Sequence, residues 1–537
     1  MSNPRLSRTD ARASERKLRA RALLCLVTAG VSACASDEPS TNGAGGKAGY
    51  GAYAGQTSAV AGHSSAGQVA QAGGAGAAAA ANGGNASPVA GTKGTAGAAV
   101  GGAGAAGTQP GGMGGGAAVV PQDGDIFVAT DGKDAAAGTQ SEPLTLPAAL
   151  KRVLPGNTIF VRAGTYKFSA QITVERDNSG SDGKLKQLFA YENEKPILDF
   201  SDEPYAKADN PRGLQINGNY WHVKGLTVFK AADNGIYVAG NHNVIENCIT
   251  HGNRDTGLQL GRYASSAATM ADWPSDNLIL NCESYDNYDA PPGAGENADG
   301  FAAKLTVGPG NVFRGCVSHH NSDDGWDLYT KSDTGPIGSV TIDQCIAHHN
   351  GTLTDGTSNE NGDRNGFKLG GEKIAVAHTV TRSVAFANGK NGFTWNSNPG
   401  AIRVSNTLAF DNAEGNYRFG DNSTPTQAVF TNNLSFWTQP GSAQADKAVG
   451  MDVSGSNCFW TKDASKSASG LTVTNADFAN ALEKTTVTRG ADGAPDFTPF
   501  ELASKSALIN AGVTPAQPLP FDATYYQGKP DLGAVEQ

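Results

Sequence analysis

The sequence predicts an all-β protein in which short strands stack as the coils of a parallel β-solenoid. Three observations support this fold class. A six-residue motif recurs six times at intervals of roughly 30 residues, a glycine before a short apolar strand recurs after it, and the repeated region has no helical periodicity. Such repeats are typical of solenoids, because each coil buries its apolar face only against the next coil.

Composition divides the 537 residues into three parts. Residues 41–120 contain 25 glycines, 25 alanines, two lysines and no acidic residue. Such a segment cannot bury enough apolar surface to offset its conformational entropy, so we expect residues 34–120 to form a disordered tether. Residues 121–537 are long enough for one large domain, and we expect them to hold the solenoid.

The first 33 residues have the composition of an export signal. Residues 1–21 are rich in arginine, and the apolar segment that follows is too short to span a bilayer. It ends in Val-Ser-Ala-Cys34, which resembles a bacterial lipobox. We therefore expect residues 1–33 to be a lipoprotein signal peptide and Cys34 to be lipidated, which anchors the protein at the outer membrane or cell surface. An ordinary cleaved signal and a secreted protein are the alternative.

The chain has a formal net charge of −10 at pH 7, although its signal segment is basic. A protein that binds nucleic acid is expected to present a basic surface, so this class is excluded. An acidic protein that acts on an acidic polymer needs cations between the two. We expect a monomer that meets the membrane through its lipid anchor alone.

The folded part is expected to begin with a helix and to continue in strands. Residues Leu144–Leu154 have helical spacing, and we expect this helix to cap the open first coil. The turn sequence Pro155-Gly-Asn157 ends the helix, and strands begin at Thr158. Beyond about residue 440 the repeat blurs, so we expect the C-terminal segment to pack along the side of the coils.

The repeated motif has the pattern [Cys/Ser/Thr]-x-[Thr/Ser/Ala]-[His/Tyr/Phe]-x-Asn. Equivalent positions of coils stacked about 4.8 Å apart form columns. We expect the last position to form a ladder of asparagine hydrogen bonds, the first to be small and buried, and the aromatic position to stack. The ladder consists of Asn253, Asn287, Asn321, Asn350, Asn388 and Asn412.

Cysteines of exported proteins often form disulfides, and five of the seven cysteines lie in or after the repeats. Four of these five open copies of the motif, so we expect them to be free, small and buried. The histidines His251, His319 and His348 share the aromatic column with Tyr285 and Phe386, and we expect them to stack rather than to bind a metal.

Carboxylates gather on neighbouring coils, in the segments Asn297-Ala-Asp-Gly300 and Asn321-Ser-Asp-Asp-Gly-Trp-Asp327. Counted from the repeated glycine, Asp299 and Asp324 occupy one column, and Asp323 and Asp327 flank it. Four carboxylates that converge repel one another unless they are protonated or bind a cation. Flexible, anionic, all-oxygen ligands suit Ca²⁺. A solvated acidic turn is the alternative interpretation.

The third coil, with Asn365-Gly-Phe-Lys368, adds a candidate base. Lys368 stands two residues after its glycine, as Asp327 does, so the two should be neighbours in one column. A lysine beside a bound dication and partly desolvated has a lowered pKa and can accept a proton. A structural ion pair between Lys368 and Asp327 is the alternative, and Lys304 is the rival base.

These three segments together resemble the pectate lyases of polysaccharide lyase family 9. The opening Asp125-Ile-Phe-Val-Ala-Thr-Asp-Gly and the closing Pro530-Asp-Leu-Gly-Ala-Val-Glu extend the resemblance over most of residues 125–537. It implies a right-handed parallel β-helix and Lys368 as the general base. It also implies a catalytic Ca²⁺ whose ligands are Asp299, Asp323, Asp324 and Asp327.

The reaction that the resemblance implies is Ca²⁺-dependent β-elimination of polygalacturonate. The cation binds the substrate carboxylate, Lys368 removes the C5 proton, and the C4–O bond breaks to leave a 4,5-unsaturated uronide. We expect the loop Gly351–Arg364 to shape the cleft, and Trp395 and Tyr417 either to stack on sugar rings or to fill the solenoid. The candidate substrate-binding cations are Lys304, Arg364, Arg403 and Arg418.

Two other functions stay open at this point. A β-helix glycoside hydrolase needs two carboxylates, one of them a protonated acid, and would leave Lys368 without a role. A surface-tethered, Ca²⁺-binding adhesin or glycan-binding protein would have the same fold without catalysis.

Overall fold

The computed structural model describes residues 119–537, except 207–209, 290–293, 359–360, 422, 425, 440–443, 449–455, 521–523 and 527. The expected signal peptide, Cys34 and nearly all of the expected tether therefore lie outside the described residues. Among the helices that are described, none has the length and apolar character needed to cross a bilayer.

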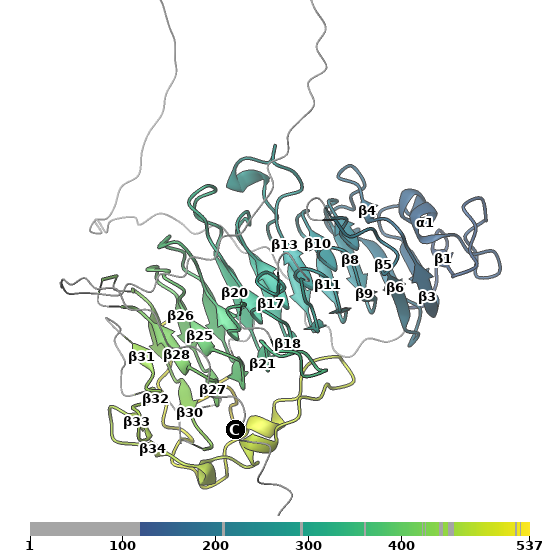
Figure 1. Ribbon diagram of the computed structural model, residues 1–537. Helices are drawn as coiled ribbons and strands as arrows, with labels where there is room; N and C mark the ends of the chain where they lie inside the picture. Colours follow the sequence, from purple (N-terminus) through teal and green to yellow (C-terminus); the bar gives the residue numbers. More distant parts are fainter. Residues whose placement is uncertain are drawn as a thin grey trace, which may run out of the picture. The chain divides into compact units, whose positions relative to one another are not determined.

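Three sheets of short parallel strands form the body of the domain, and each coil adds one strand to each sheet (Figure 1). Sheet A consists of β1 (Ile126–Val128), β2 (Thr158–Val161), β5 (Lys186–Ala190), β8 (Trp221–Lys224), β11 (Val244–Glu246), β14 (Leu278–Leu280), β17 (Asn311–Arg314), β20 (Val340–Asp343), β23 (Thr379–Thr381), β26 (Arg403–Ser405) and β29 (Val429–Thr431). Sheet B consists of β3 (Gly164–Lys167), β6 (Pro196–Asp199), β9 (Thr227–Phe229), β12 (Ile249–His251), β15 (Glu283–Tyr285), β18 (Val317–His319), β21 (Ile346–His348), β24 (Val384–Phe386), β27 (Leu408–Phe410), β30 (Leu434–Phe436), β32 (Cys458–Trp460), β33 (Ser465–Ser467) and β34 (Thr472–Val473). Sheet C consists of β4 (Ile172–Val174), β7 (Leu214–Ile216), β10 (Ile236–Val238), β13 (Leu258–Leu260), β16 (Phe301–Ala303), β19 (Trp326–Asp327), β22 (Phe367–Lys368), β25 (Asn391–Thr394), β28 (Gly415–Phe419) and β31 (Lys447–Ala448).

The predicted all-β, parallel solenoid is confirmed. The paired strands are parallel except where β32, β33 and β34 turn back on one another at the end of sheet B. Strands this short cannot hold a sheet alone, so the stacking of coils supplies most of their stability.

Sheet C alternates between inward and outward side chains, and this alternation positions the candidate site. Its inward positions carry a stack of aromatic rings with centroids 4.7–5.2 Å apart. The next residue of each strand points outward. The stacked residues are Phe301, Trp326, Phe367, Phe393 and Tyr417, so the Tyr417 ring fills the solenoid instead of facing a sugar.

The asparagine ladder is confirmed along the turn between sheets B and C. Each Nδ2 donates to the Oδ1 of the next asparagine, at 2.8–3.0 Å from Asn253 to Asn412. These side chains are buried, and they also donate to carbonyl groups of sheet B, as Asn388 does to Ala347 and Asn412 to Ala385. The ladder therefore holds successive turns in register.

The interpretation of the cysteines and histidines as packing residues is also confirmed. The five cysteines after residue 121 are free and buried, with no disulfide among the described residues. His251, Tyr285, His319, His348, Phe386 and Phe410 form a continuous stack with centroids 4.8–4.9 Å apart.

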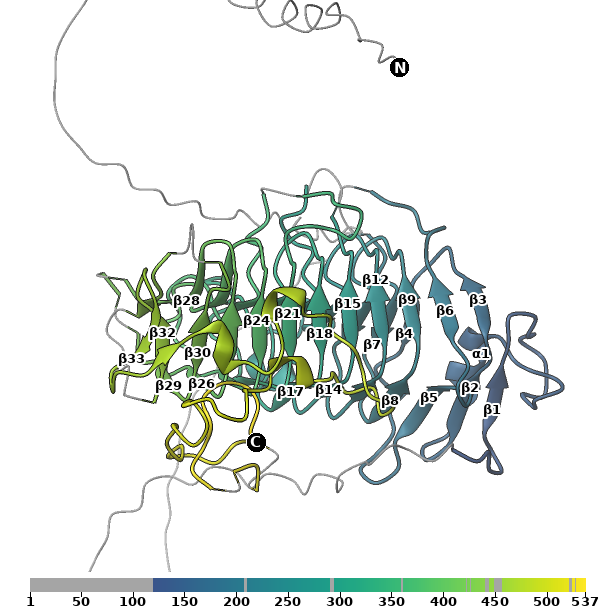
Figure 2. The same ribbon diagram turned by 90° about the horizontal axis from the view of Figure 1, so that it is seen from below.

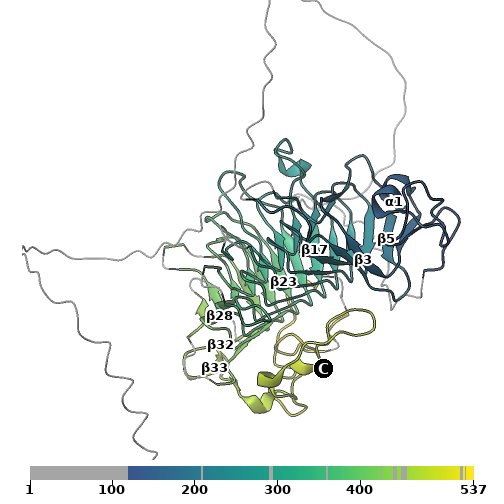
Figure 3. The ribbon, with the colours of Figure 1, turned by 45° about the vertical axis from the view of Figure 1, so that its right-hand side comes forward.

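A helix covers the first coil of the described solenoid, and the C-terminal segment packs against its side. Helix α1 (Leu146–Arg152) begins after Thr145, buries Leu146, Ala149 and Leu150, and lies at the β1 end of the stack, as the sequence predicts (Figure 3). The C-terminal segment, with 3-10 turns at Asn475–Asp477, Leu482–Lys484 and Thr498–Phe500, runs along the side of the coils (Figure 2).

Side-chain contacts tie this C-terminal segment to the coils. The Arg489 guanidinium donates to the carbonyl groups of Asn281 and Cys282, and its Nε lies 3.1 Å from a Glu283 carboxylate oxygen. Phe500 adds an apolar contact, with its ring 6.1 Å from that of Phe386.

A fully buried histidine gives a testable pH dependence. His378 Nδ1 accepts a hydrogen bond from the backbone N–H of Val340 in the preceding coil. In the same column, the Oδ1 atoms of Asn277 and Asn311 each accept the equivalent hydrogen bond from a backbone N–H of the preceding coil. Burial lowers the pKa of His378 from 6.5 to about 3. Its folded-state pKa is depressed, so its stabilising contribution is complete above pH 6.5 and is lost as the pH falls from 6.5 toward 3.

We expect His378→Asn to remove this dependence, because asparagine already makes the equivalent hydrogen bond in the same column. Denaturant unfolding at pH 7, 6, 5 and 4 should show wild type losing up to about 1.4 kcal/mol per pH unit relative to the variant. Parallel pH profiles for the two proteins would show that His378 does not contribute in this way.

Candidate active site

The candidate site lies where two aspartates replace the usual polar residues of one column. The residue before the repeated glycine is Thr256, Asp299, Asp324, Asn365 and Asn391 in five successive coils. Thr256 Oγ1 donates to Asp299 Oδ2 at 3.0 Å, and Asn365 Nδ2 donates to Asp324 Oδ1 at 2.8 Å. The surrounding column therefore holds both carboxylates by their hydrogen bonds.

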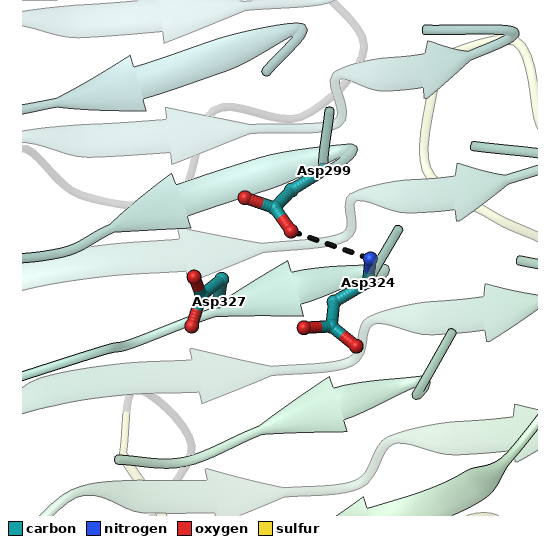
Figure 4. Close-up of side chains that lie close together, drawn as sticks. All are labelled: Asp299, Asp324 and Asp327. Carbon is teal, nitrogen blue, oxygen red and sulfur yellow. Dashed lines mark hydrogen bonds between the residues drawn. The ribbon is translucent and has the colours of Figure 1, made fainter. Parts of the chain in front are cut away.

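Three of the four predicted ligands converge. Asp299, Asp324 and Asp327 each offer a carboxylate oxygen within 4.8 Å of the others (Figure 4). The backbone N–H of Asp324 also donates to Asp299 Oδ1 at 3.3 Å. Asp323 is buried beside this group, but its carboxylate accepts the backbone N–H of Asp363.

Two lysines neutralise part of this charge. Lys304 Nζ lies 2.6 Å from Asp299 Oδ2 and 3.4 Å from Asp327 Oδ2. Lys368 pairs with Asp327 in the register of β19 and β22, as predicted, and its Nζ lies 3.0 Å from Asp324 Oδ2. Asp324 Oδ2 nevertheless accepts no hydrogen bond from the described residues, because this ion pair lacks hydrogen-bond geometry.

Burial and mutual repulsion perturb the pKa values of these carboxyl groups. Burial raises the pKa of Asp299 to about 8 against the attraction of Lys304, and it raises the pKa of Asp324 to about 6. The pKa of Asp323 is also raised well above its usual value, first by burial and then by Asp324. These raised pKa values mean that the carboxylates are costly to keep ionised together. Protons or a bound cation would relieve their mutual repulsion.

Burial alone would lower the pKa of the Lys368 ammonium, but nearby carboxylates raise it well above its ordinary value. The carboxylates of Asp324, Asp327 and Asp363 dominate this effect. Lys368 thus stays protonated while these acids are its neighbours. The lowered pKa expected from the sequence depends on a bound dication and stays a prediction.

Asp363 is a site residue that the sequence analysis missed. Its carboxylate lies 3.0 Å from the Nζ atoms of both Lys368 and Lys390, and it comes from the end of the loop before β22. Its position has no counterpart in the repeat, because this loop is longer than the equivalent turns. A comparison of loop lengths points to the segment but not to the residue.

The other predicted residues lie at different distances from this group. Trp395 and Arg418 line a hollow next to Lys368 on sheet C. The stem of Arg364 packs against Gly351 and Gly389, beside the site. Arg403 is not brought to the site, because it lies on sheet A and donates to the carbonyl groups of residues 517 and 518. It is therefore not retained as a substrate-binding residue.

Comparison with known proteins identifies the family of this chain. Residues 126–433 match the model of the Pel9A-like right-handed β-helix region. A protein of Paenibacillus polymyxa (strain SC2) named pectate lyase L is 52% identical over 390 residues, which cover 72% of this chain and 84% of that protein.

Two solved structures are similar to this chain in sequence and in fold. The crystal structure of pectate lyase Pel9A has a TM-score of 0.63 and 33% identity, and covers 77% of this chain and 96% of its own. A structure named rhamnogalacturonan lyase has a TM-score of 0.58 and 26% identity, and covers 71% and 96%. The chain therefore belongs to the Pel9A-like right-handed β-helix family, and it is a polysaccharide lyase.

Proposed function

We propose that this protein is a Ca²⁺-dependent pectate lyase that cleaves polygalacturonate by β-elimination. The observation that supports this function best is a lysine amine held against a cluster of converging carboxylates on one outward face of sheet C. The relatives named pectate lyase support the substrate class.

The carboxylates fit a hard divalent cation. Asp299, Asp324 and Asp327 supply only oxygen atoms, and buried oxygens of Asp324 and Asp327 accept no hydrogen bond from the described residues. Ca²⁺ accepts six to eight oxygen ligands, so three or four aspartates would leave positions for a substrate carboxylate. We include Asp323 as a fourth ligand, which requires its carboxylate to turn from the Asp363 N–H.

When bound, Ca²⁺ would supply positive charge beside the uronate carboxylate and so stabilise the anion that develops at C5. Once Asp324 and Asp327 bind the cation, Lys368 would keep Asp363 but lose two of the carboxylates that hold its proton, and this loss lowers the pKa of its ammonium group. Its free amine then takes the C5 proton, the C4–C5 double bond forms and the C4–O bond breaks. The leaving oxygen takes a proton from solvent, and no water is added across the bond.

Lys304 and Asp363 would orient these groups. Lys304 bridges Asp299 and Asp327 and so holds two proposed ligands apart at a fixed distance. Asp363 keeps a contact with the Lys368 amine that does not depend on the proposed ligands. It would therefore hold Lys368 toward the substrate after cation binding.

A second candidate substrate is rhamnogalacturonan, which is favoured by the similarity to the structure of that name. It also contains galacturonate, so the same residues would act. A glycoside hydrolase is disfavoured, because the carboxylate oxygens lie within 4.8 Å of one another. Retaining glycosidases space their two carboxyl groups about 5–5.5 Å apart, and inverting ones about 6.5–9.5 Å apart. A non-catalytic adhesin would need none of these contacts.

We also propose that the domain is exported and tethered as a monomeric lipoprotein through Cys34, with residues 34–120 as the tether. The motif before Cys34 and the glycine- and alanine-rich composition support this. Partition of the full-length protein into a detergent phase should be lost in Cys34→Ser. A soluble wild-type protein would contradict the anchor.

The elimination reaction has a direct test. Residues 121–537 with polygalacturonate and Ca²⁺ should release product with the ultraviolet absorbance of an unsaturated uronide, and excess chelator should stop this. Lys368→Ala should lower kcat by about 100- to 10,000-fold, the range for a general base. Rhamnogalacturonan in the same assay decides between the two substrates.

Lys304→Ala is the matched comparison, because Lys304 is the rival base in the same cluster. A smaller loss of kcat in this variant than in Lys368→Ala supports the assignment, and the reverse order would exchange the two roles. New reducing ends without the absorbance would indicate hydrolysis. If no uronide gives a product, the non-catalytic adhesin is the interpretation that remains.

Cation binding can be tested apart from catalysis. At 100 times its dissociation constant, Ca²⁺ should stabilise the folded protein by about 2.7 kcal/mol. Asp324→Asn should abolish this gain and still fold, because asparagine occupies the same column position in the next two coils. Thermal unfolding with Ca²⁺ and with chelator measures both effects.

Asp463→Asn removes one exposed carboxylate elsewhere and should keep the Ca²⁺ effect. Full stabilisation of Asp324→Asn by Ca²⁺ would place the cation outside this cluster. Failure of Asp324→Asn to fold in chelator would identify the carboxylate as structural.

A further inference from the structure

A hollow of about 220 Å³ lies on sheet C next to Lys368. Its lining comes from β25, β28 and β31 and from the turns beside them, and it includes Trp395, Arg418 and Lys447. The Trp395 side chain is nearly buried but reaches the wall of the hollow. Its size suits a segment of a polymer that lies along the surface rather than a whole drug-sized ligand.

Strand register places two cations of this hollow in the column of the proposed base. Lys368 pairs with Thr394, Thr394 pairs with Arg418, and Arg418 pairs with Lys447. At about 4.8 Å per coil, Arg418 and Lys447 stand about 10 Å and about 14 Å along the column from Lys368. The three side chains therefore leave the same outward face in a line parallel to the solenoid axis.

The part of the chain that the structure describes does not hold these two cations in ion pairs. Neither Arg418 nor Lys447 forms an ion pair with a residue that the structure describes, and the guanidinium makes one long hydrogen bond, 3.5 Å to Gln444. Lys390, the third cation of the hollow, differs because Asp363 binds it at 3.0 Å.

The acidic side chains of the hollow offset part of this charge. Asp363 is held by two lysines. The Asp421 carboxylate accepts hydrogen bonds from Ser423 and Thr424, and these bonds together with the attraction of Lys447 lower its pKa. Glu414 is left as the acid without such a partner among the described residues that line the hollow. Arg418 is therefore the cation of the hollow that is left for an added carboxylate, while Lys447 also attracts Asp421.

A glycine makes room for the Arg418 side chain. Gly415 continues the column of Asn365 and Asn391, and a Cβ atom there would lie 3.2 Å from the Arg418 Cδ. The missing side chain lets the arginine stem lie across this position while its guanidinium remains at the hollow. A guanidinium that is fixed by its stem suits bidentate binding of a carboxylate.

The column is different on the other side of the proposed ligands. Before Asp327 it carries Ala302, Gln259 and Tyr237, which are uncharged at neutral pH. Carboxylate-binding side chains of this column thus lie on one side of Lys368, the side toward the C-terminal coils.

We propose that this hollow is a subsite that binds the carboxylate of a uronate unit of the substrate. Arg418 binds the carboxylate, Lys447 adds positive charge beyond it, and Trp395 contacts the sugar ring. The proposal rests on the proposed lyase function and deepens it, because it states where along the solenoid the acidic polymer is held. On the C-terminal side of the cleavage point, this column binds the negative charge of the substrate. On the other side, its uncharged side chains do not require a substrate carboxylate.

Binding of tetragalacturonate in the presence of Ca²⁺ tests this subsite without turnover. Calorimetry in a Lys368→Ala background should give a dissociation constant at least about tenfold higher for Arg418→Gln. Arg418→Lys should lie between, because it keeps the charge and loses the bidentate geometry. Lys133→Gln, which removes one exposed charge near the first coil, is the matched control and should bind as the parent does.

Methyl-esterified tetragalacturonate separates charge from shape. The ratio of the two dissociation constants, Arg418→Gln over parent, should fall to about one for the ester. An unchanged ratio for the ester, or equal binding of the acid by both proteins, overturns the subsite. A circular dichroism spectrum matching the parent excludes misfolding of the variant as the cause.

The subsite and the lyase function fail in different ways. With Lys368 intact, Arg418→Gln should raise KM for polygalacturonate by at least about tenfold. Product formation by wild type with an unchanged KM in the variant refutes the subsite and keeps the lyase. Absence of unsaturated product from wild type refutes the lyase, and the calorimetric result then reports uronate binding alone.

Discussion

The hydrogen-bonded stacking of one coil on the next, in register, is the constraint on which the rest of this domain depends. Each strand pairs with its counterpart one coil away, so a side chain in one coil has a fixed neighbour in the next. The ladder from Asn253 to Asn412 and the aromatic stack from His251 to Phe410 hold this register on the turn and on sheet B. Chemistry can then be introduced by replacing one member of a column.

The candidate site uses this property at two neighbouring positions. Asp299 and Asp324 replace threonine and asparagine in a column whose hydrogen bonds remain in place. Buried carboxylates are costly, and Lys304 and Lys368 offset only part of that cost. The long apolar interior and the ladders carry the stability of the domain, so the site can remain electrostatically strained.

The sequence predicted those features that repeat. The columns, the free cysteines, the stacked histidines and the Asp327–Lys368 register followed from motif spacing, because a solenoid converts spacing into contact. The family also followed from motifs in three coils.

Features that do not repeat could not be found in this way. Asp363 reaches Lys368 from the end of a loop with no equivalent in other coils, and Asp323 turns to a backbone N–H that the same loop supplies. Arg403 seemed available because its sheet was not assigned from the sequence; the C-terminal segment occupies its guanidinium. Loop conformation and the packing of the C-terminal segment depend on tertiary contacts, which the spacing of the repeated motif does not predict.

The central feature of the proposed site is a cation held by aspartates that the column places together. A crystal structure of Lys368→Ala with Ca²⁺ and tetragalacturonate, with anomalous diffraction to locate the cation, tests this most directly. We expect one Ca²⁺ bound by Asp299, Asp324 and Asp327, joined by Asp323 as a fourth ligand, with a uronate carboxylate completing its coordination. A cation bound elsewhere, with Asp299, Asp324 and Asp327 still paired to lysine, would contradict this expectation.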